Sequence, residues 1–230
     1  MTENQSAHHG TFLRFSLLKV QPEWRRLDVE QRQSHKAEFA SAIEKCSQEV
    51  ETFSYSTQGI RAEGELLLWQ TSPSLESLQQ SASHIFKSGL GQYMETSISL
   101  LGIIRPSHYV KKQSAQEQAL SEPERLKYLI VYPFVKTTDW YLYSRETRQG
   151  MMNEHIRVGH EYASVRQVLA YSFGVDDQEF VVTYETDVLE DFQDLVMALR
   201  ATEARRYTMR DTPILVGIYH QLEDALNLIG

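Results

Sequence analysis

Apolar and polar residues alternate along the first clearly patterned stretch of the chain, TFLRFSLLKV at residues 11–20. Such alternation indicates a strand with one buried face. Further along, the apolar residues Phe39, Ile43 and Cys46 recur at helical spacing instead. The pattern therefore predicts six elements in the first half of the chain: strand 11–20, helix 31–48, strand 50–58, strand 64–72, helix 74–88 and strand 97–105.

The second half of the chain repeats this order. Its predicted elements are strand 126–134, helix 145–163, strands 166–174 and 178–186, helix 188–207, strand 213–220 and a short helix from residue 222. Identical residues also recur at one constant separation, as Leu75 with Leu189 and Tyr93 with Tyr207. The shared order and separation indicate an internal duplication.

Each half has the order β-α-β-β-α-β, which is the ferredoxin-like arrangement. Two such halves can pair their sheets with the helices outside. The predicted fold is α+β, with two ferredoxin-like repeats forming a dimeric α+β barrel within one chain. The expected boundaries are a disordered N-terminus at 1–10, an N-terminal half at 11–106, a polar linker at 107–125 and a C-terminal half at 126–230.

Composition excludes several classes of protein. Cys46 is the one cysteine in 230 residues, so the chain has no internal disulfide and no cysteine-rich metal site. A net charge of −8 argues against a non-specific nucleic-acid binder, which needs a basic surface. No apolar run approaches the roughly 20 residues that span a bilayer, and the first ten residues lack the apolar segment of a signal peptide. We therefore expect a cytoplasmic protein without a membrane span.

A histidine in the second half is the first candidate for chemistry. His155 lies in the predicted helix 145–163, and the duplication places Ser41 at the corresponding position of the first half. Its helix face also carries Met151, Met152, Val158, Gly159 and Tyr162. An imidazole with space beside it could bind the iron of a porphyrin. Spacing alone favours an ordinary core histidine, and His160 is a competing candidate.

Several motifs of the second half together resemble the chlorite dismutase superfamily, and within it the coproheme decarboxylases. These motifs are Tyr-Pro-x-x-Lys at 132–136, Trp140, Glu-His at 154–155, Tyr162, and Gly-x-Asp-Asp at 174–177 followed by Phe180. The first half matches only in its pattern of elements, although the superfamily also has the doubled ferredoxin-like fold. The resemblance implies a haem-dependent enzyme.

The resemblance also implies roles for individual residues. His155 would be the axial ligand of the iron, and Tyr132 the residue that forms a radical. Lys136 would hold a propionate, and Gln167 would be the polar residue on the opposite side of the porphyrin. Taken without the resemblance, Tyr132 is more simply a packed strand aromatic and Lys136 a solvated strand end.

Six further residues are assigned to the cofactor pocket. Glu203 is expected to accept a hydrogen bond from His155, although it could equally be a solvated helix carboxylate. Arg105, Ser107 and Tyr109 are expected to hold propionates, because carboxylates need cations or hydroxyls. Trp140 and Met152 are expected to line the pocket.

The implied activity is peroxide-dependent oxidative decarboxylation of coproheme to haem b, so the ligand is haem b or iron coproporphyrin III and the oxidant is hydrogen peroxide. Chlorite dismutases instead carry an arginine over the iron. A one-residue slip of the strand would turn Arg166 inward in place of Gln167, because strand side chains alternate between faces. A chlorite dismutase or peroxidase-like enzyme is therefore the alternative, and a porphyrin carrier or sensor is the second. The resemblance also implies that the protein assembles as a homopentamer.

Overall fold

The structure is a computed structural model that describes residues 10–105, 109 and 124–230. The predicted disordered segment 1–10 lies outside the described residues apart from Gly10, and the predicted linker lies largely outside them. The strands are β1 (Thr11–Val20), β2 (Glu51–Ser56), β3 (Leu66–Ser72), β4 (Met94–Ile104), β5 (Tyr128–Lys136), β6 (Arg166–Tyr171), β7 (Phe180–Thr186), β8 (Thr208–Arg210) and β9 (Leu215–His220).

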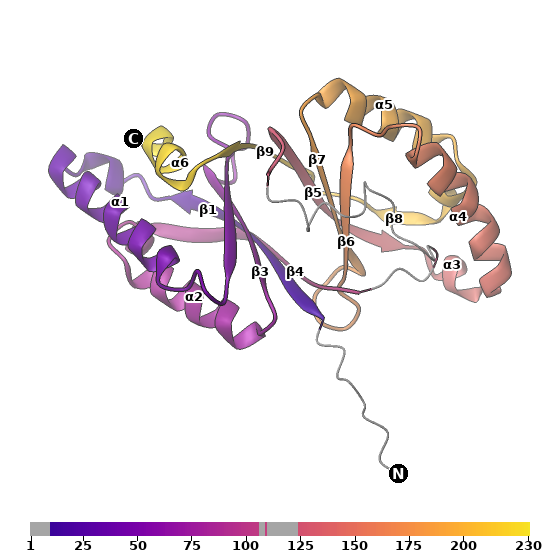
Figure 1. Ribbon diagram of the computed structural model, residues 1–230, viewed down its shortest axis with the longest axis horizontal. Coiled ribbons are helices and arrows are strands. Elements are labelled where there is room, and N and C mark those ends of the chain that lie inside the picture. Colours follow the sequence, from indigo (N-terminus) through magenta and orange to yellow (C-terminus); the bar gives the residue numbers. More distant parts are fainter. Residues whose placement is uncertain (1–9, 106–108, 110–123) are drawn as a thin grey trace, which may run out of the picture.

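Helices follow the strands in each half (Figure 1). They are α1 (Val29–Glu44), α2 (Leu75–Lys87), α3 (Thr138–Leu142), α4 (Arg145–Gly159), α5 (Leu189–Arg200) and α6 (Leu222–Ile229), with the short 3-10 helices η1 (Trp24–Arg26), η2 (Gly91–Tyr93) and η4 (Glu203–Tyr207). No helix in the described part of the chain has both the length and the apolar character needed to cross a membrane.

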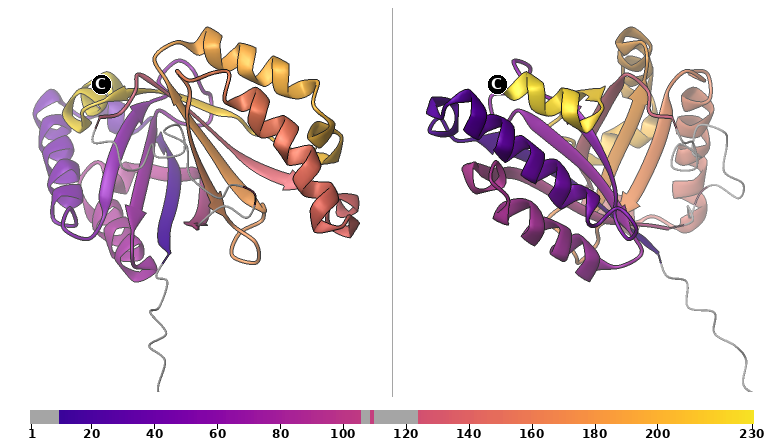
Figure 2. Two further views of the ribbon diagram at one scale, coloured as in Figure 1. Left: turned by 45° about the vertical axis from the view of Figure 1, so that its right-hand side comes forward. Right: turned by 60° about the vertical axis from the view of Figure 1, so that its left-hand side comes forward.

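The strands form one antiparallel sheet in the order β7-β6-β4-β1-β3-β2-β9-β5-β8, and β5 also pairs with β7. The two halves share this sheet, because β4 of the first half pairs with β6 of the second, and β2 pairs with β9. Helices α1, α2 and α6 cover the first-half strands, whereas α4 and α5 cover the second-half strands (Figure 2). The α+β fold with two similar halves is confirmed.

Two predicted helices are shorter in the structure. The predicted helix 145–163 ends at Gly159, and the predicted helix 188–207 ends at Arg200. Thr202 breaks the second helix, because its backbone is extended (φ −79°, ψ 150°) and its hydroxyl donates to the carbonyl of Leu199 at 2.8 Å. The prediction of one continuous helix to residue 207 is therefore wrong. The five residues of α3 and the three of β8 are too short to show a periodic pattern.

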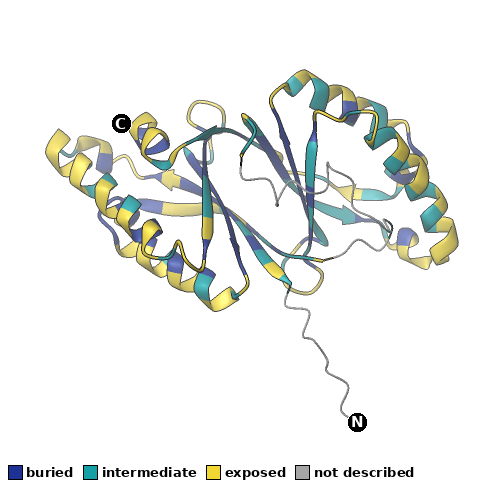
Figure 3. Ribbon diagram, in the orientation of Figure 1, coloured by how far each residue is buried: buried dark blue, intermediate teal, exposed yellow. Residues whose placement is uncertain are grey.

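The two helical layers are packed differently. In the first half, Phe39 of α1 and Ile85 of α2 are buried against the sheet in one continuous cluster. In the second half, all fifteen residues of α4 are at least partly exposed (Figure 3). Helix α5 buries Leu195 against the sheet. The duplicated half thus lacks a tightly packed helix at α4, and this leaves room for a cavity.

Candidate functional site

A cavity of about 420 Å³ lies between the second-half strands and their helices. Strand alternation decides which side chains reach it. On β5, Leu129 and Val131 face the core that joins the two halves, whereas Tyr132 and Lys136 face the other side and line the cavity. The wall is closed by residues of α4, α5 and η4. Among the described residues, the lining comes from the second half, from Ile104 and Arg105 at the end of the first half, and from Tyr109.

His155 lines the cavity from α4, and its side chain is largely removed from water. Burial, and after it the positive charge of Lys136, lower the pKa of His155 to about 4. The ring is therefore neutral at neutral pH. Its Nδ1 atom is buried and has no hydrogen-bond partner among the described residues. One turn on, a Cβ on Gly159 would meet nothing within 4 Å apart from its chain neighbours and its own helix backbone, so there is open space next to the ring. Because Nδ1 is enclosed by protein, Nε2 is the nitrogen through which the neutral imidazole is suited to bind a metal in the cavity.

No group of three histidine, cysteine, aspartate or glutamate side chains in the described part of the chain could hold a bare metal ion. His155 is therefore not part of a metal site made by several side chains. A single imidazole suits an iron whose other ligands come from a macrocycle. The residues present thus fit an iron porphyrin.

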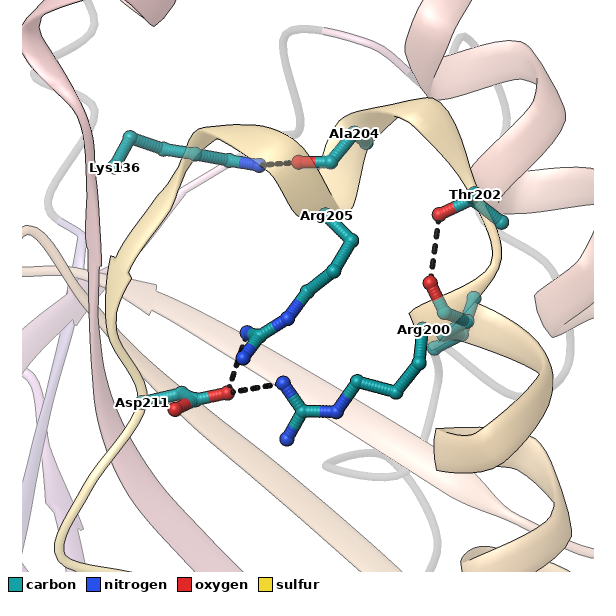
Figure 4. Close-up of polar contacts among 7 residues, drawn as sticks. Lys136, Arg200, Thr202, Ala204, Arg205 and Asp211 are labelled. Atoms are coloured by element: carbon teal, nitrogen blue, oxygen red, sulfur yellow. Dashed lines mark hydrogen bonds and ion pairs between the residues drawn. The ribbon is translucent and has the colours of Figure 1, made fainter.

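Lys136 is buried at the end of β5. Its Nζ donates to the carbonyl oxygen of Ala204 at 3.0 Å (Figure 4). The same atom lies 4.3 Å from the centre of the Trp140 ring. Burial lowers the pKa of Lys136 to about 8, and the nearby Arg205 adds to this shift. The ammonium has a single carbonyl partner in the hydrogen bonds of the described residues, and carboxylates would hold it more strongly.

Tyr132 lines the cavity four residues before Lys136 on the same face of β5. Its ring stacks on that of Tyr184 in β7, with the ring centres 6.3 Å apart, and the two phenols are hydrogen-bonded. Burial, and then Tyr184, raise the pKa of Tyr132 well above its ordinary value. Tyr132 is therefore a neutral phenol at the cavity wall.

The register of β6 decides between Gln167 and Arg166. Gln167 pairs with Tyr184 and Arg166 pairs with Glu185. Tyr184 and Gln167 both line the cavity, whereas Arg166 is on the other face of β6 and donates to the carbonyl of Glu124 at 2.9 Å. The slip that would bring Arg166 into the cavity does not occur in this structure.

The remaining predicted residues are only partly brought together. Trp140, Met152, Arg105 and Tyr109 line the cavity, and His160 does so from an exposed position. Ser107 lies outside the described residues. The expected bond between Glu203 and His155 is not formed here: Arg206 donates to the Glu203 carboxylate at 3.0 Å, and the backbone N–H of Glu203 donates to Glu154 at 3.0 Å.

Three cavity residues were missed by the sequence analysis: Arg200, Arg205 and Asp211. Both arginines donate to the Asp211 carboxylate (Figure 4). On one continuous helix, Arg200 and Arg205 would point about 140° apart. The break at Thr202 instead brings both guanidiniums to one carboxylate. Within the part of the chain that the structure describes, the charged residues lining the cavity are Arg105, Lys136, Arg200 and Arg205 against Asp211 alone, so this part of an acidic protein is positively charged.

Known proteins resemble this chain over most of its length. Residues 32–220 match the family model described as chlorite dismutase. The chain is 32% identical to the coproheme decarboxylase of Mycolicibacterium smegmatis over 173 residues, 75% of this chain and 74% of that protein. It is 23% identical to the chlorite dismutase of Ideonella dechloratans over 229 residues, 96% of this chain and 80% of that protein.

Solved structures give the same result for the fold. A mutant chlorite dismutase from Candidatus Nitrospira defluvii superposes with a TM-score of 0.87 and is 28% identical, covering 95% of this chain and 94% of that one. The imidazole complex of the same enzyme superposes with a TM-score of 0.86 at 27% identity, over the same shares of the two chains. The chain belongs to the chlorite dismutase family.

Proposed function

We propose that this protein binds an iron porphyrin through His155 and converts coproheme to haem b by peroxide-dependent oxidative decarboxylation of two propionates. Members of the family are haem-dependent enzymes, and the Mycolicibacterium smegmatis relative is named for this reaction. The observation that carries the proposal is the shared cavity: a neutral imidazole, a buried phenol and a buried ammonium, His155, Tyr132 and Lys136, line one space. Its surplus of cations favours a ligand with several carboxylates.

Each of the three residues has a distinct part in this reaction. A bound iron porphyrin would supply, through peroxide, two one-electron oxidising equivalents within the cavity. The Tyr132 phenol would give one electron and its proton to this oxidant, and the phenoxyl would then take a hydrogen atom from the β-carbon of a propionate. That transfer restores the phenol. The second electron would also pass to the peroxide-derived oxidant, CO₂ would leave and a vinyl group would remain, while the Lys136 ammonium holds the propionate carboxylate in place.

Gln167 favours this reaction over the conversion of chlorite. A fixed positive charge stabilises a bound anion, and a neutral amide provides a hydrogen bond without that charge. Of the two residues in question, Gln167 lines the cavity and Arg166 does not. The amide of Gln167 is suited to bind a neutral peroxide molecule.

Assembly into several copies is part of the same proposal. Helix α3 exposes apolar surface, with Leu142 78% exposed and its neighbours Tyr141 and Tyr143 more than a third exposed. Surface of this kind supports an interface between copies, consistent with the homopentamer expected from the resemblance.

The proposed activity is tested with purified protein, iron coproporphyrin III and hydrogen peroxide. We expect mass spectrometry to show a product in which two propionates have become vinyl groups. Oxygen release on addition of chlorite, with coproheme unchanged, would favour a chlorite dismutase instead. Tight porphyrin binding without either reaction would indicate a carrier or sensor.

Porphyrin binding is expected to weaken as the pH rises through about 8. Because the pKa of Lys136 is lowered to about 8, its ammonium is largely neutral above that pH and no longer attracts a carboxylate. A bound carboxylate stabilises the protonated form of Lys136, so the affinity for the porphyrin falls as the pH increases. Fluorescence titrations of the protein with metal-free coproporphyrin III, at pH values from about 6.5 to about 9.5 on both sides of this pKa, measure the effect. The Lys136→Gln variant should bind more weakly at pH 7 and show no such step.

A further inference from the structure

Two guanidiniums share one carboxylate oxygen at the cavity wall. Arg200 donates from Nη1 to Oδ2 of Asp211 at 3.0 Å, and Arg205 donates from Nη1 to the same oxygen at 2.6 Å. The three side chains come from α5, η4 and the segment after β8, so the fold and not one local turn brings them together (Figure 4). We call Arg200, Arg205 and Asp211 the arginine–aspartate cluster.

The arginine–aspartate cluster carries one uncancelled positive charge. Each guanidinium has five N–H groups, and the contact with Asp211 uses one nitrogen of each. The side chains of Arg200 and Arg205 are 43% and 34% exposed, against 20% for Asp211. The arginines therefore keep N–H donors for a further acidic group, although Asp211 neutralises part of their positive charge.

The arginine–aspartate cluster also lies close to the proposed reacting residue. Asp211 and Arg200 act electrostatically on Tyr132 with opposite signs, and all three line the cavity. A carboxylate beside Tyr132 would thus come within reach of these guanidiniums. Asp211 would repel the same carboxylate, so its charge opposes ligand binding at this edge of the cavity.

We propose that Asp211 is a specificity-determining residue that weakens the hold of Arg200 and Arg205 on a ligand carboxylate at this edge of the cavity. The proposal rests on the proposed function, in which the cavity takes a porphyrin with propionates. By cancelling one of the two guanidinium charges, Asp211 reduces the preference of this edge for a porphyrin that places a carboxylate there. A dicarboxylate product that has lost its carboxylate at this edge offers the guanidiniums nothing to hold, so Asp211 affects its binding less.

The test measures binding of metal-free porphyrins, which involves neither iron ligation nor turnover. Coproporphyrin III has one propionate on each of its four pyrrole rings. Protoporphyrin IX has propionates on two adjacent pyrrole rings and vinyl groups on the other two, so it can turn its vinyl groups toward the cluster. In the Asp211→Asn variant the cluster charge rises, so the affinity for coproporphyrin III should increase by about tenfold and that for protoporphyrin IX by less. The ratio of the two dissociation constants is the readout, because a general loss of structure would change both alike.

Two further variants separate charge from folding. In Asp211→Asn combined with Arg205→Gln, the cluster charge returns to its original value, and the affinity ratio should return with it. Arg200→Gln alone removes a positive charge and should lower the affinity for coproporphyrin III by about tenfold while affecting protoporphyrin IX less. This variant keeps the proposal testable even if Asp211→Asn does not fold.

Glu161→Gln is the matched control. It removes the same charge from an exposed carboxylate that pairs with Arg157 and does not line the cavity, so the ratio should not change. An unchanged or reversed ratio in Asp211→Asn would overturn the proposal. Failure of the proposed function is a separate result, because wild-type protein that binds coproporphyrin III without decarboxylating its iron complex can still show the expected ratios.

Discussion

The His155→Ala variant is expected to lose the spectrum of histidine-ligated ferric porphyrin and to bind the iron porphyrin at least about 100-fold more weakly. His155 lines the cavity with an imidazole that is neutral at working pH, and because Nδ1 is buried, Nε2 is the nitrogen that can bind iron. Alanine supplies no ligand in its place. Absorption spectra in the Soret region, recorded during a titration with ferric coproporphyrin III, measure both the ligation and the affinity.

Two controls make this result specific to the imidazole. His160→Ala removes the competing histidine, which lines the cavity from an exposed position, and should leave the spectrum unchanged. Free imidazole added to His155→Ala should restore much of the original spectrum, because the space of the lost ring is next to the open volume beside Gly159. An unchanged spectrum in His155→Ala would remove this residue from the iron site. A loss confined to His160→Ala would move the ligand to that position.

The fold could be predicted because each half has strong local patterns. Strand alternation and helical spacing depend on which face is buried, and the duplication supplied the same order twice. The pairing of β2 with β9 and of β4 with β6 joins residues far apart in sequence, and no local pattern indicates it. Helix α3 is also too short to produce a periodic pattern, although it positions the Trp140 ring beside the Lys136 ammonium.

The site could be predicted only where motifs carried it. Tyr132, Lys136 and His155 belong to the motifs that resemble the chlorite dismutase superfamily, and the structure places all three at one cavity. The arginine–aspartate cluster depends on the helix break at Thr202 and on a contact between separate elements, so spacing along the chain conceals it. The sequence also could not decide whether Gln167 or Arg166 faces the cavity, because a register shift by one residue moves every side chain of a strand to the opposite face.

The duplication explains why the cavity lies in one half. Both halves present a sheet face to a helical layer, but over the first-half strands the interface is filled by Trp24 and Phe39, together with Leu226 of the C-terminal helix α6. The second half places polar and small residues on α4 at comparable positions, and its core cluster on that side is smaller. The stability supplied by the first half and by the shared sheet permits the second half to keep an open interior.

The Tyr132→Phe variant is expected to lose decarboxylation by at least about 1,000-fold while binding iron coproporphyrin III within about threefold of wild type. Phenylalanine keeps the ring that packs on Tyr184 but has no phenolic hydrogen to lose. Removing its hydroxyl also removes the hydrogen bond between the two phenols, which costs about 1 kcal/mol of stability. Product masses after addition of peroxide measure the reaction, and a Soret titration measures the affinity.

Tyr171→Phe provides the matched control, because Tyr171 also lines the cavity, on β6, and the substitution removes the same atom. If any lost phenol disturbed the cavity, both variants would fail alike. If Tyr132 is the residue that is oxidised, only Tyr132→Phe loses the reaction, and the tyrosyl signal that peroxide produces in electron paramagnetic resonance spectra of the loaded wild-type protein disappears with it. Full activity in Tyr132→Phe would place the radical elsewhere and leave His155 and Lys136 as binding residues only, because neither can supply a hydrogen-abstracting phenoxyl.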